Sequence, residues 1–419
     1  MSSKHYDIAI IGGSLSARIA AVLLAKHGSK VLFLRNREAS ASTWFHSSLF
    51  LEKLLGILGG RACFVAQQPI QVLSRKARIT LSNDVPLDDE LCREFGPTGP
   101  AVAEWFERLR VQGVQLEELF WENCGLPWPS FKTTVGFKLL SMRRGVQWAE
   151  LDAPVSKSLA QLPATAVALA TDLLQGLALQ DINRLSRAQA ALLWAQAMRP
   201  ENLKEPDFSA LLSKRFDQFH GLKADLADLE KLDFDGSRWT GGQIRNGGKF
   251  TATGFLLGDA RWAEHFKPGK MSALPDPQDL LKQMTSSLTG QLSRLLASRV
   301  ICGGNMPLRL AIEERDNQLC GQILCSGEPT ESQLRQQLEP ALPFADYALA
   351  TEEDSHSPQT APATASQPQS LTSLPLRIGR NLYCADSSRL LPEMGASGAA
   401  LLGWTLAENL AAKRKQAQK

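Results

Sequence analysis

The first 35 residues carry the clearest pattern of apolar and polar positions in the chain. Residues 7–12 and residues 30–34 are short, largely apolar runs, as expected of strands buried on both faces of a parallel sheet. Between them, residues 16–27 place alanines and leucines on one face at helical spacing, and Gly28 then favours termination of the helix. The pattern predicts a strand–helix–strand unit with parallel strands.

The rest of the chain divides into stretches of strand and helical character. They are strands over residues 61–82, helices over 97–205, strands over 221–260 and a helix over 276–297. Asn246-Gly247 predicts a tight hairpin, because both central residues of such a turn need positive φ. Residues 307–326 then predict two strands around Asp316-Asn317.

Composition excludes several classes of function. Apolar residues make up 44% and charged residues 21% of the 419 residues, as in an ordinary soluble globular protein. The net charge of +3 provides no electrostatic basis for binding nucleic acid. The 7 cysteines form no Cys-x-x-Cys pair and the 6 histidines do not cluster, so we expect no metal site. Scattered thiols favour a reducing, cytoplasmic location.

Membrane insertion is not expected either. The N-terminal apolar run is broken by glycines and followed at once by a helix, unlike the core of a secretory signal peptide. The longest apolar stretch, residues 159–180, is interrupted by Pro163, Asp172 and Gly176, so it does not predict a transmembrane span. Peripheral contact with a bilayer, a protein partner and a homodimer stay open.

The turn after the first strand has the character of a dinucleotide-binding loop. In the pattern Gly-x-Gly-x-x-Gly, the glycines allow a tight turn, close approach of phosphate and close helix packing. Gly12 keeps the first position and Gly13 adds flexibility, whereas Ser14 replaces the central glycine. A serine hydroxyl can still donate a hydrogen bond to phosphate, and the N–H groups of a helix start attract it. The candidate pyrophosphate contacts are Gly12, Gly13, Ser14, Ser16 and Ala17.

The end of the second strand departs from that pattern. An acidic residue that binds the adenosine ribose hydroxyls would stand there, but the sequence has Arg35, followed by Asn36 and Arg37. An arginine at this point suits a 2′-phosphate better than a bare ribose, which favours NADP. The alternative is that these are solvated loop charges. Arg35 and Asn36 are the candidate contacts.

The C-terminal segment, residues 381–412, carries a second candidate site. Residues 382–385 are predicted to form a short buried strand with Asp386 at its end. After a loop, Gly395 and Gly398 open a helix. Its first turns contain the further small residues Ala399, Ala400 and Gly403. A helix start of small residues lets a large ligand come close, and its dipole favours negative charge.

Together, the two ends of the chain resemble flavin-dependent oxidoreductases of the amine oxidase and phytoene desaturase type. In that family the last strand carries a Gly-Asp pair, which Ala385-Asp386 matches with one change, and a helix of small residues follows. The matching helix residues are Gly398, Ala399, Gly403 and Ala407. The resemblance implies that Asp386 lies near the ribityl chain or pyrophosphate of FAD. It also implies that Met394 to Gly398, including Gly395, lie near the flavin ring.

The resemblance implies two further contacts with the cofactor. The strands that follow the helical insertion would supply backbone contacts to adenine, at Ala224 to Leu226. Gly59-Gly60-Arg61 is similar to the family's Gly-Gly-Arg, although it lies later in the chain, which makes Arg61 a candidate. No catalytic base is identifiable, and hydride transfer to a flavin often needs none.

Three functions follow from these features. The first is an FAD-dependent oxidoreductase that oxidises or desaturates a small, largely apolar or amine-bearing substrate beneath the tryptophan-rich helical insertion. The second is a redox-inactive scaffold or partner subunit of the same fold, because the central glycine, the ribose acid and the glycine before Asp386 are all replaced. The third is an NADP-binding protein, favoured by Arg35 and Arg37.

The expected architecture is an α/β fold of two domains, the default for a chain of this length. One is a Rossmann-like FAD/NAD(P)-binding domain with a parallel sheet and a β-meander, and the other is a mixed substrate domain with the helical insertion. We assign residues 1–90, 210–265 and 375–419 to the first, and residues 91–209 and 266–350 to the second. Residues 351–374 are rich in Ser, Thr, Gln and Pro, so we expect a flexible loop there.

Overall fold

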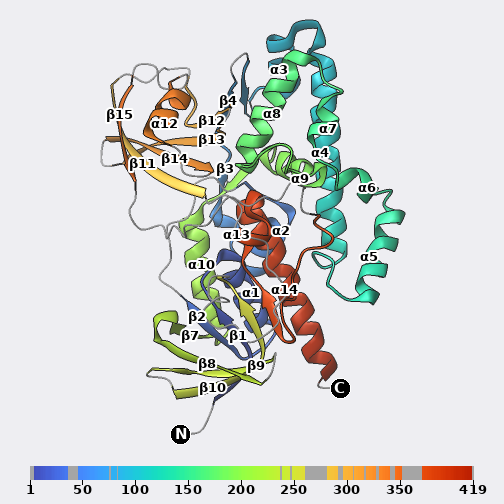
Figure 1. The fold of residues 1–419 in the computed structure, drawn as a ribbon, viewed down its shortest axis with the longest axis vertical. Coiled ribbons are helices and arrows are strands. Elements are labelled where there is room, and N and C mark those ends of the chain that lie inside the picture. The colour runs from blue at the N-terminus through green and yellow to red at the C-terminus, as the bar shows by residue number, and fades with distance from the viewer. Residues whose placement is uncertain are drawn as a thin grey trace.

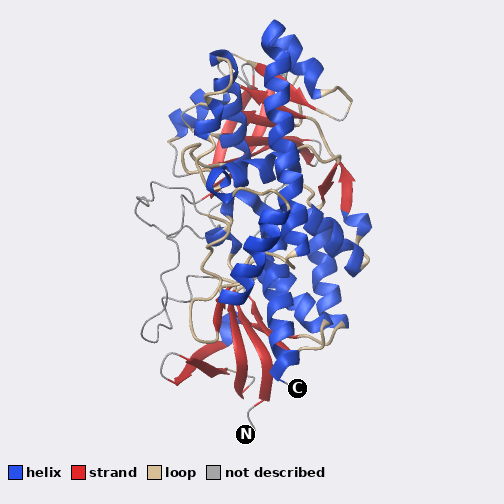
Figure 2. Ribbon diagram, turned by 90° about the vertical axis from the view of Figure 1, so that its right-hand side faces the viewer, coloured by secondary structure: helices blue, strands red, loops and turns tan. Residues whose placement is uncertain are grey.

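Two sheets lie at opposite ends of an elongated molecule, with helices between and beside them (Figures 1 and 2). The computed structural model of the chain describes residues 4–35, 46–74, 77–82, 84–235, 238–245, 248–259, 281–290, 296–304, 306–315, 318–326, 330–339, 345–351 and 370–417. The predicted α/β fold with a parallel sheet is confirmed.

The first sheet contains five parallel strands in the order β7-β2-β1-β10-β16. They are β1 (Lys4–Ile11), β2 (Val31–Arg35), β7 (Leu222–Asp225), β10 (Gly248–Leu257) and β16 (Leu382–Cys384). Strands β1 and β2 are buried along most of their length, which explains their nearly unbroken apolar runs. Segments from the beginning, middle and end of the chain therefore meet in one sheet.

A β-meander extends this sheet on one side. Strands β8 (Leu229–Asp235) and β9 (Arg238–Ile244) pair in antiparallel fashion with each other, and β9 pairs with β10. A hairpin between β9 and β10 is confirmed by the pairing of Ile244 with Gly248, which leaves three residues between the paired positions instead of the two of the predicted tight turn. Asn246 and Gly247 themselves lie outside the described residues.

Helices α1 (Leu15–Lys26) and α14 (Gly395–Ala417) cross closely beside the first sheet. A Cβ added at Gly403 of α14 would lie 2.7 Å from the carbonyl oxygen of Ser16 and 2.9 Å from the Cβ of Ile19. A larger residue at position 403 would push the two helices apart. Helix α10 (Glu205–Gln218) also contacts α1.

The second sheet is mixed and has the strand order β15-β11-β14-β13-β12-β4-β5. Its strands are β4 (Ile70–Leu73), β5 (Arg78–Leu81), β11 (Leu281–Gly290), β12 (Arg299–Cys302), β13 (Leu308–Arg315), β14 (Gln318–Ser326) and β15 (Ala345–Thr351). The predicted pair of strands around residues 316–317 is confirmed as β13 and β14. Strands β4 and β5 lie within residues 1–90, which were assigned to the nucleotide-binding domain, yet they pair in this second sheet. The proposed domain boundaries stay a prediction.

The helix predicted over residues 276–297 is wrong for residues 281–290, which form β11. This strand pairs along nearly its whole length with β14 on one side and over seven residues with β15 on the other. Hydrogen bonding to strands distant in the sequence overrides the local helical spacing, which carries no information about such partners.

The predicted helical insertion over residues 97–205 is confirmed. Its helices, with the helix that precedes them, are α3 (Leu87–Phe95), α4 (Gly99–Glu122), α5 (Phe131–Arg143), α6 (Trp148–Leu151), α7 (Ser156–Leu159), α8 (Ala164–Ala178) and α9 (Arg187–Ala197). Trp105, Phe106 and Trp194 pack on one another in its interior, as core aromatics do.

Smaller elements join these parts. They are α2 (Leu49–Leu58), α12 (Glu331–Leu338), α13 (Ser387–Leu390), η1 (Arg61–Cys63), η2 (Gly96–Thr98), η3 (Leu226–Asp228), η4 (Pro392–Met394), β3 (Phe64–Ala66) and β6 (Glu201–Leu203). Within the described residues, no helix combines the length and apolarity needed to cross a bilayer. Residues 352–369 of the loop expected at 351–374 lie outside the described residues, whereas Leu371 is buried.

Candidate functional site

The candidate site begins at the turn between β1 and α1. Gly12 has a φ of +99°, and a Cβ added there would lie 2.4 Å from the backbone nitrogen of Asp259. Its N–H donates to the Leu34 carbonyl at 2.9 Å, and the Gly258 N–H donates to the Ile11 carbonyl at 2.6 Å. Gly12 therefore makes the tight turn that the sequence predicts, with the end of β10 packed directly against it.

Two serines at the start of α1, the N-cap Ser14 and Ser16 in the first turn, join the two ends of the chain. The hydroxyl of Ser14 donates to the carbonyl of Ala385 at 2.7 Å, and the hydroxyl of Ser16 donates to the same carbonyl at 2.5 Å. Ser16 also accepts a hydrogen bond from the N–H of Ser387 at 3.2 Å. These contacts bring the loop after β1 and the loop after β16 side by side, at the carboxyl ends of parallel strands, where open α/β sheets bind their ligands.

The start of α1 offers backbone N–H donors to a diphosphate, but the hydroxyl of its N-cap serine already donates to another group. The N–H groups of Gly13, Ser14 and Leu15 have no hydrogen-bond acceptor among the described residues, and the N-terminus of a helix attracts negative charge. Ser14 caps the helix by accepting from the N–H of Ala17 at 3.3 Å, and its single hydroxyl proton is directed to Ala385. Backbone donors are therefore available for phosphate, whereas the predicted Ser14 donor is already engaged.

Asp386 lies in the loop that these serines contact. It is the N-cap of α13, and its carboxylate accepts from the N–H of Ser388 at 3.0 Å and from the hydroxyl of Ser388 at 2.5 Å. The side chain is nearly buried. Asp386 therefore fixes the loop conformation beside the start of α1, and its contact with a cofactor stays a prediction.

The adenosine end of the candidate site lies where β2 and β7 end together. Arg35 pairs in register with Asp225, so an acidic residue stands beside it on the neighbouring strand. The carboxylate of Asp225 accepts from the N–H of Ala227 at 2.9 Å. The sequence placed residues 224–226 near adenine by resemblance but did not indicate that Asp225 stands beside Arg35, because strand order is not visible in a single sequence. Asn36 lies outside the described residues, and the side chain of Leu226 is completely buried in the core.

The glycines before Arg61 have a structural explanation. Gly59 ends α2 with a φ of +67°, and a Cβ added at Gly60 would lie 2.2 Å from the Cδ2 of Leu211. Arg61 itself is exposed in η1, and among the described residues no hydrogen bond connects it with the loops after β1 and β16. The proposed cofactor contact of Arg61 stays a prediction.

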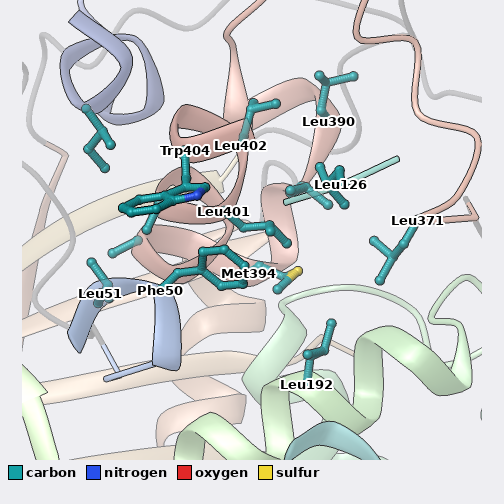
Figure 3. Close-up of a cluster of buried hydrophobic side chains, with 14 of the residues drawn as sticks. Phe50, Leu51, Leu126, Leu192, Leu371, Leu390, Met394, Leu401, Leu402 and Trp404 are labelled. Carbon is teal, nitrogen blue, oxygen red and sulfur yellow. The ribbon is translucent and has the colours of Figure 1, made fainter. Parts of the chain in front are cut away.

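The segment expected beside a flavin ring is enclosed by apolar side chains. Met394 lies beside Phe50 of α2 and near Leu192 of α9, in a cluster that Trp404 of α14 also joins (Figure 3). A Cβ added at Gly398 would lie 2.7 Å from the Cβ of Met394. Gly395 is exposed with a φ of +51°, and Ala399 is buried. This close packing accounts for the small residue at 398 without a ligand.

Glu393 is a buried carboxyl that sequence reasoning missed. Burial raises its pKa to about 7, an effect opposed by its backbone hydrogen bond and by the side chain of Gln189. The Gln189 amide donates to Glu393 at 2.7 Å, while its oxygen accepts from the N–H of Ser186 at 2.9 Å. The only signal in the sequence is that Glu393 stands among Leu390, Leu391 and Met394.

We expect Glu393 to make folding stability fall as the pH rises. Its folded-state pKa of about 7 lies above the value of 4.5 for a free glutamate, so its stabilising contribution is complete below pH 4.5 and is lost up to pH 7. Between pH 4.5 and pH 7 this contribution to the free energy of unfolding falls by about 3 kcal/mol. Glu393→Gln keeps an acceptor for Gln189 and should remove this component, as measured by denaturant unfolding across that range. The control Glu104→Gln alters an exposed carboxyl of α4 and should leave the slope unchanged. An unchanged slope in Glu393→Gln would contradict the assignment.

Solved structures with the same fold come from amine-oxidising enzymes. No protein-family model matches the sequence, and no curated protein matches it. Cyclohexylamine oxidase from Brevibacterium oxydans IH-35A has a TM-score of 0.58 at 13% identity, covering 98% of this chain and 99% of that one. Putrescine oxidase bound to putrescine also has a TM-score of 0.58 at 13% identity, covering 98% of this chain and 100% of that one.

A third structure is a geranylgeranyl bacteriochlorophyll reductase-like protein from Thermoplasma acidophilum, with a TM-score of 0.50 at 11% identity. The match covers 99% of this chain and 80% of the reductase-like protein. At these identities the similarity establishes the fold, and it extends over nearly the whole chain. The chain therefore has the fold of the amine oxidases, as the motifs at its two ends predicted.

Proposed function

We propose that this protein is an FAD-dependent oxidoreductase whose cofactor lies with its diphosphate at the N-terminus of α1. The observation that carries the proposal is the pair of serine hydroxyls that bind the Ala385 carbonyl. They hold the loop after β1 against the loop after β16, the two segments whose motifs resemble those of flavoenzymes. The whole-length similarity to amine oxidases supports the same proposal.

The residues of the chain would hold and orient the cofactor. The N–H groups of Gly13, Ser14 and Leu15 would bind the diphosphate, and Gly12 lets the chain turn closely enough for that contact. The apolar cluster around Met394 would keep water away from the buried first turns of α14 that follow Gly395. FAD, when bound, supplies a hydride acceptor for a C–H or N–H bond.

We propose a small substrate, largely apolar or bearing an amine. The buried apolar and aromatic side chains between α2, α9 and α14 favour such a molecule over a highly charged one. Cyclohexylamine oxidase and putrescine oxidase, which have the same fold, are named for amine substrates, and this supports an amine-bearing substrate.

All seven cysteines are free thiols, which supports a cytoplasmic location.

A redox-inactive scaffold of the same fold is the second candidate. Two observations favour it: the proton of the Ser14 hydroxyl is engaged by Ala385, and Met394 is packed tightly by neighbouring side chains. Both reduce the space and the donors that a cofactor would use.

Purified protein separates the two candidates. An oxidised-flavin absorbance spectrum, or a rise in melting temperature on adding FAD, is expected for the oxidoreductase. A colourless protein that FAD does not stabilise would support the scaffold. Stabilisation by NADP but not by FAD, lost in Arg35→Glu, would instead support an NADP-binding protein.

We expect Ser14→Gly to tighten FAD binding about three- to tenfold, because removing the hydroxymethyl group lets phosphate approach the helix dipole more closely. The hydroxyl of Ser16 still binds the Ala385 carbonyl in this variant and keeps the two loops together. Titration of flavin fluorescence measures the change. The matched control is Ser48→Gly, which also removes a serine cap, at the start of α2, and should leave the affinity unchanged. Weaker binding in Ser14→Gly than in the control would contradict the proposed phosphate position.

A further inference from the structure

Helix α5 presents an apolar stripe to solvent. Its exposed apolar side chains are Phe131 (85% exposed), Val135 (39%), Leu139 (49%) and Met142 (66%). At 100° per residue these four positions fall on one face, within about a quarter of a turn. Isolated exposed apolar residues need no explanation, but a continuous stripe on one helix does.

The opposite face of α5 holds the helix on the protein. Phe137 is buried and stacks on Phe120 of α4 with ring centroids 5.9 Å apart. Ser141 is buried and accepts a hydrogen bond from the indole of Trp148 at 3.0 Å. Figure 1 shows α5 at the right edge of the molecule, and Figure 2 views the molecule from that side. The helix is thus packed on one side and open on the other.

Basic residues border the apolar stripe on both sides. Lys138 lies at one edge, whereas Lys132 and Arg143 lie at the other, and all three are exposed. None of the three forms an ion pair with a described residue. Residues 131–145 contain no Asp or Glu, and Arg144 is neutralised by Glu122 of α4. The surface of α5 therefore combines apolar side chains with uncompensated positive charge.

We propose that α5 docks on the surface of a bilayer that contains anionic lipids. A helix with an apolar face bordered by Lys and Arg lies in the membrane interface, with its apolar side chains among the acyl chains and its cations at the headgroups. The charge complementarity of the stripe commits the proposal to this occupant, because neither an apolar protein groove nor a second copy of this cationic face would neutralise Lys132, Lys138 and Arg143. This docking is independent of whether the protein binds FAD.

Vesicle co-sedimentation of the full chain tests the proposal. We expect binding to vesicles of phosphatidylcholine mixed with phosphatidylglycerol, weaker binding to phosphatidylcholine alone, and further weakening at high salt. Phe131→Ser combined with Met142→Ser should weaken binding by at least about tenfold. Val111→Ser, on an exposed apolar residue of α4, is the matched control and should bind as the unaltered protein does.

Charge variants test whether the basic residues of α5 contribute to vesicle binding. Lys132→Glu with Lys138→Glu should weaken binding by about tenfold or more, whereas Lys26→Glu with Lys249→Glu, on exposed lysines of α1 and β10, should change it little. Because all these side chains are exposed, the melting temperatures should stay close together, which separates loss of binding from loss of folding. Absence of binding to anionic vesicles, or equal binding by all variants, would overturn the proposal. A dimer that dissociates in Phe131→Ser/Met142→Ser would overturn it in favour of a second copy.

Discussion

Gly12→Val is expected to lower the free energy of unfolding by more than about 4 kcal/mol and to abolish cofactor binding, because two backbone effects combine there. The φ of +99° is strained for any residue with a Cβ, and a Cβ would lie 2.4 Å from the nitrogen and 2.6 Å from the Cβ of Asp259. The turn and the end of β10 would have to separate. Urea unfolding followed by circular dichroism measures the loss.

A glycine without these constraints provides the matched control. Gly56 lies inside α2, and a Cβ added there has no atom within 4 Å. Gly56→Ala should therefore stabilise the protein, by up to about 1 kcal/mol, through its better helix propensity. If Gly12→Val unfolded at the same urea concentration as the unaltered protein, the described turn would be incorrect.

Arg199→Ala is expected to destabilise the protein by about 3–5 kcal/mol at neutral pH, because it leaves a carboxylate buried without its cation. Arg199 is hydrogen-bonded to Glu117 of α4 and to Glu52 of α2. Glu117 is 2% exposed, and its other hydrogen bonds are long, at 3.4 Å from both the N–H of Leu49 and the amide of Gln196. Arg199, which follows the end of α9, therefore joins that end to α2 and α4.

The pH dependence of this loss identifies its cause. Burial already raises the pKa of Glu117 despite Arg199, and removal of the arginine should raise it further. A group with a raised folded-state pKa favours folding at low pH, so the deficit of Arg199→Ala should shrink on acidification from pH 7 to pH 5. Arg144→Ala, which breaks an exposed pair with Glu122, is the control and should cost less than about 1 kcal/mol. A deficit no larger than in Arg144→Ala would contradict the role of Arg199.

Local signals predicted the parts of the fold that are local. The strand–turn–helix at β1 and α1 was predictable because Gly12 needs a positive φ and the strand is buried on both faces. Strand β11 was not predictable, because its pairing with β14 and β15 depends on segments distant in the chain. The stripe on α5 has ordinary helical spacing, and only the packing of Phe137 determines which face is open.

In the candidate site, too, local features were predictable from the sequence, whereas contacts between distant segments were not. The sequence indicated that the loops around Ser14 and Asp386 belong to one site, but not that the hydroxyl of Ser14 donates to a carbonyl 371 residues away. It also did not indicate that Glu393 is buried, because a glutamate after a proline is typical of an exposed turn. The partner of a polar group decides its chemistry, and such partners are set by tertiary structure.

The pairing of β1 with β10, and of β10 with β16, has a consequence for synthesis on the ribosome. His5 and Thr251, which contact each other across this pairing, are separated by 246 residues, and β16 is made later still. Strand β1 must wait, unpaired on one edge, until β10 has been translated. Such delayed closure makes folding slow and exposes an apolar strand edge, so chaperones that shield nascent chains should matter more for this protein than for one with sequential pairing.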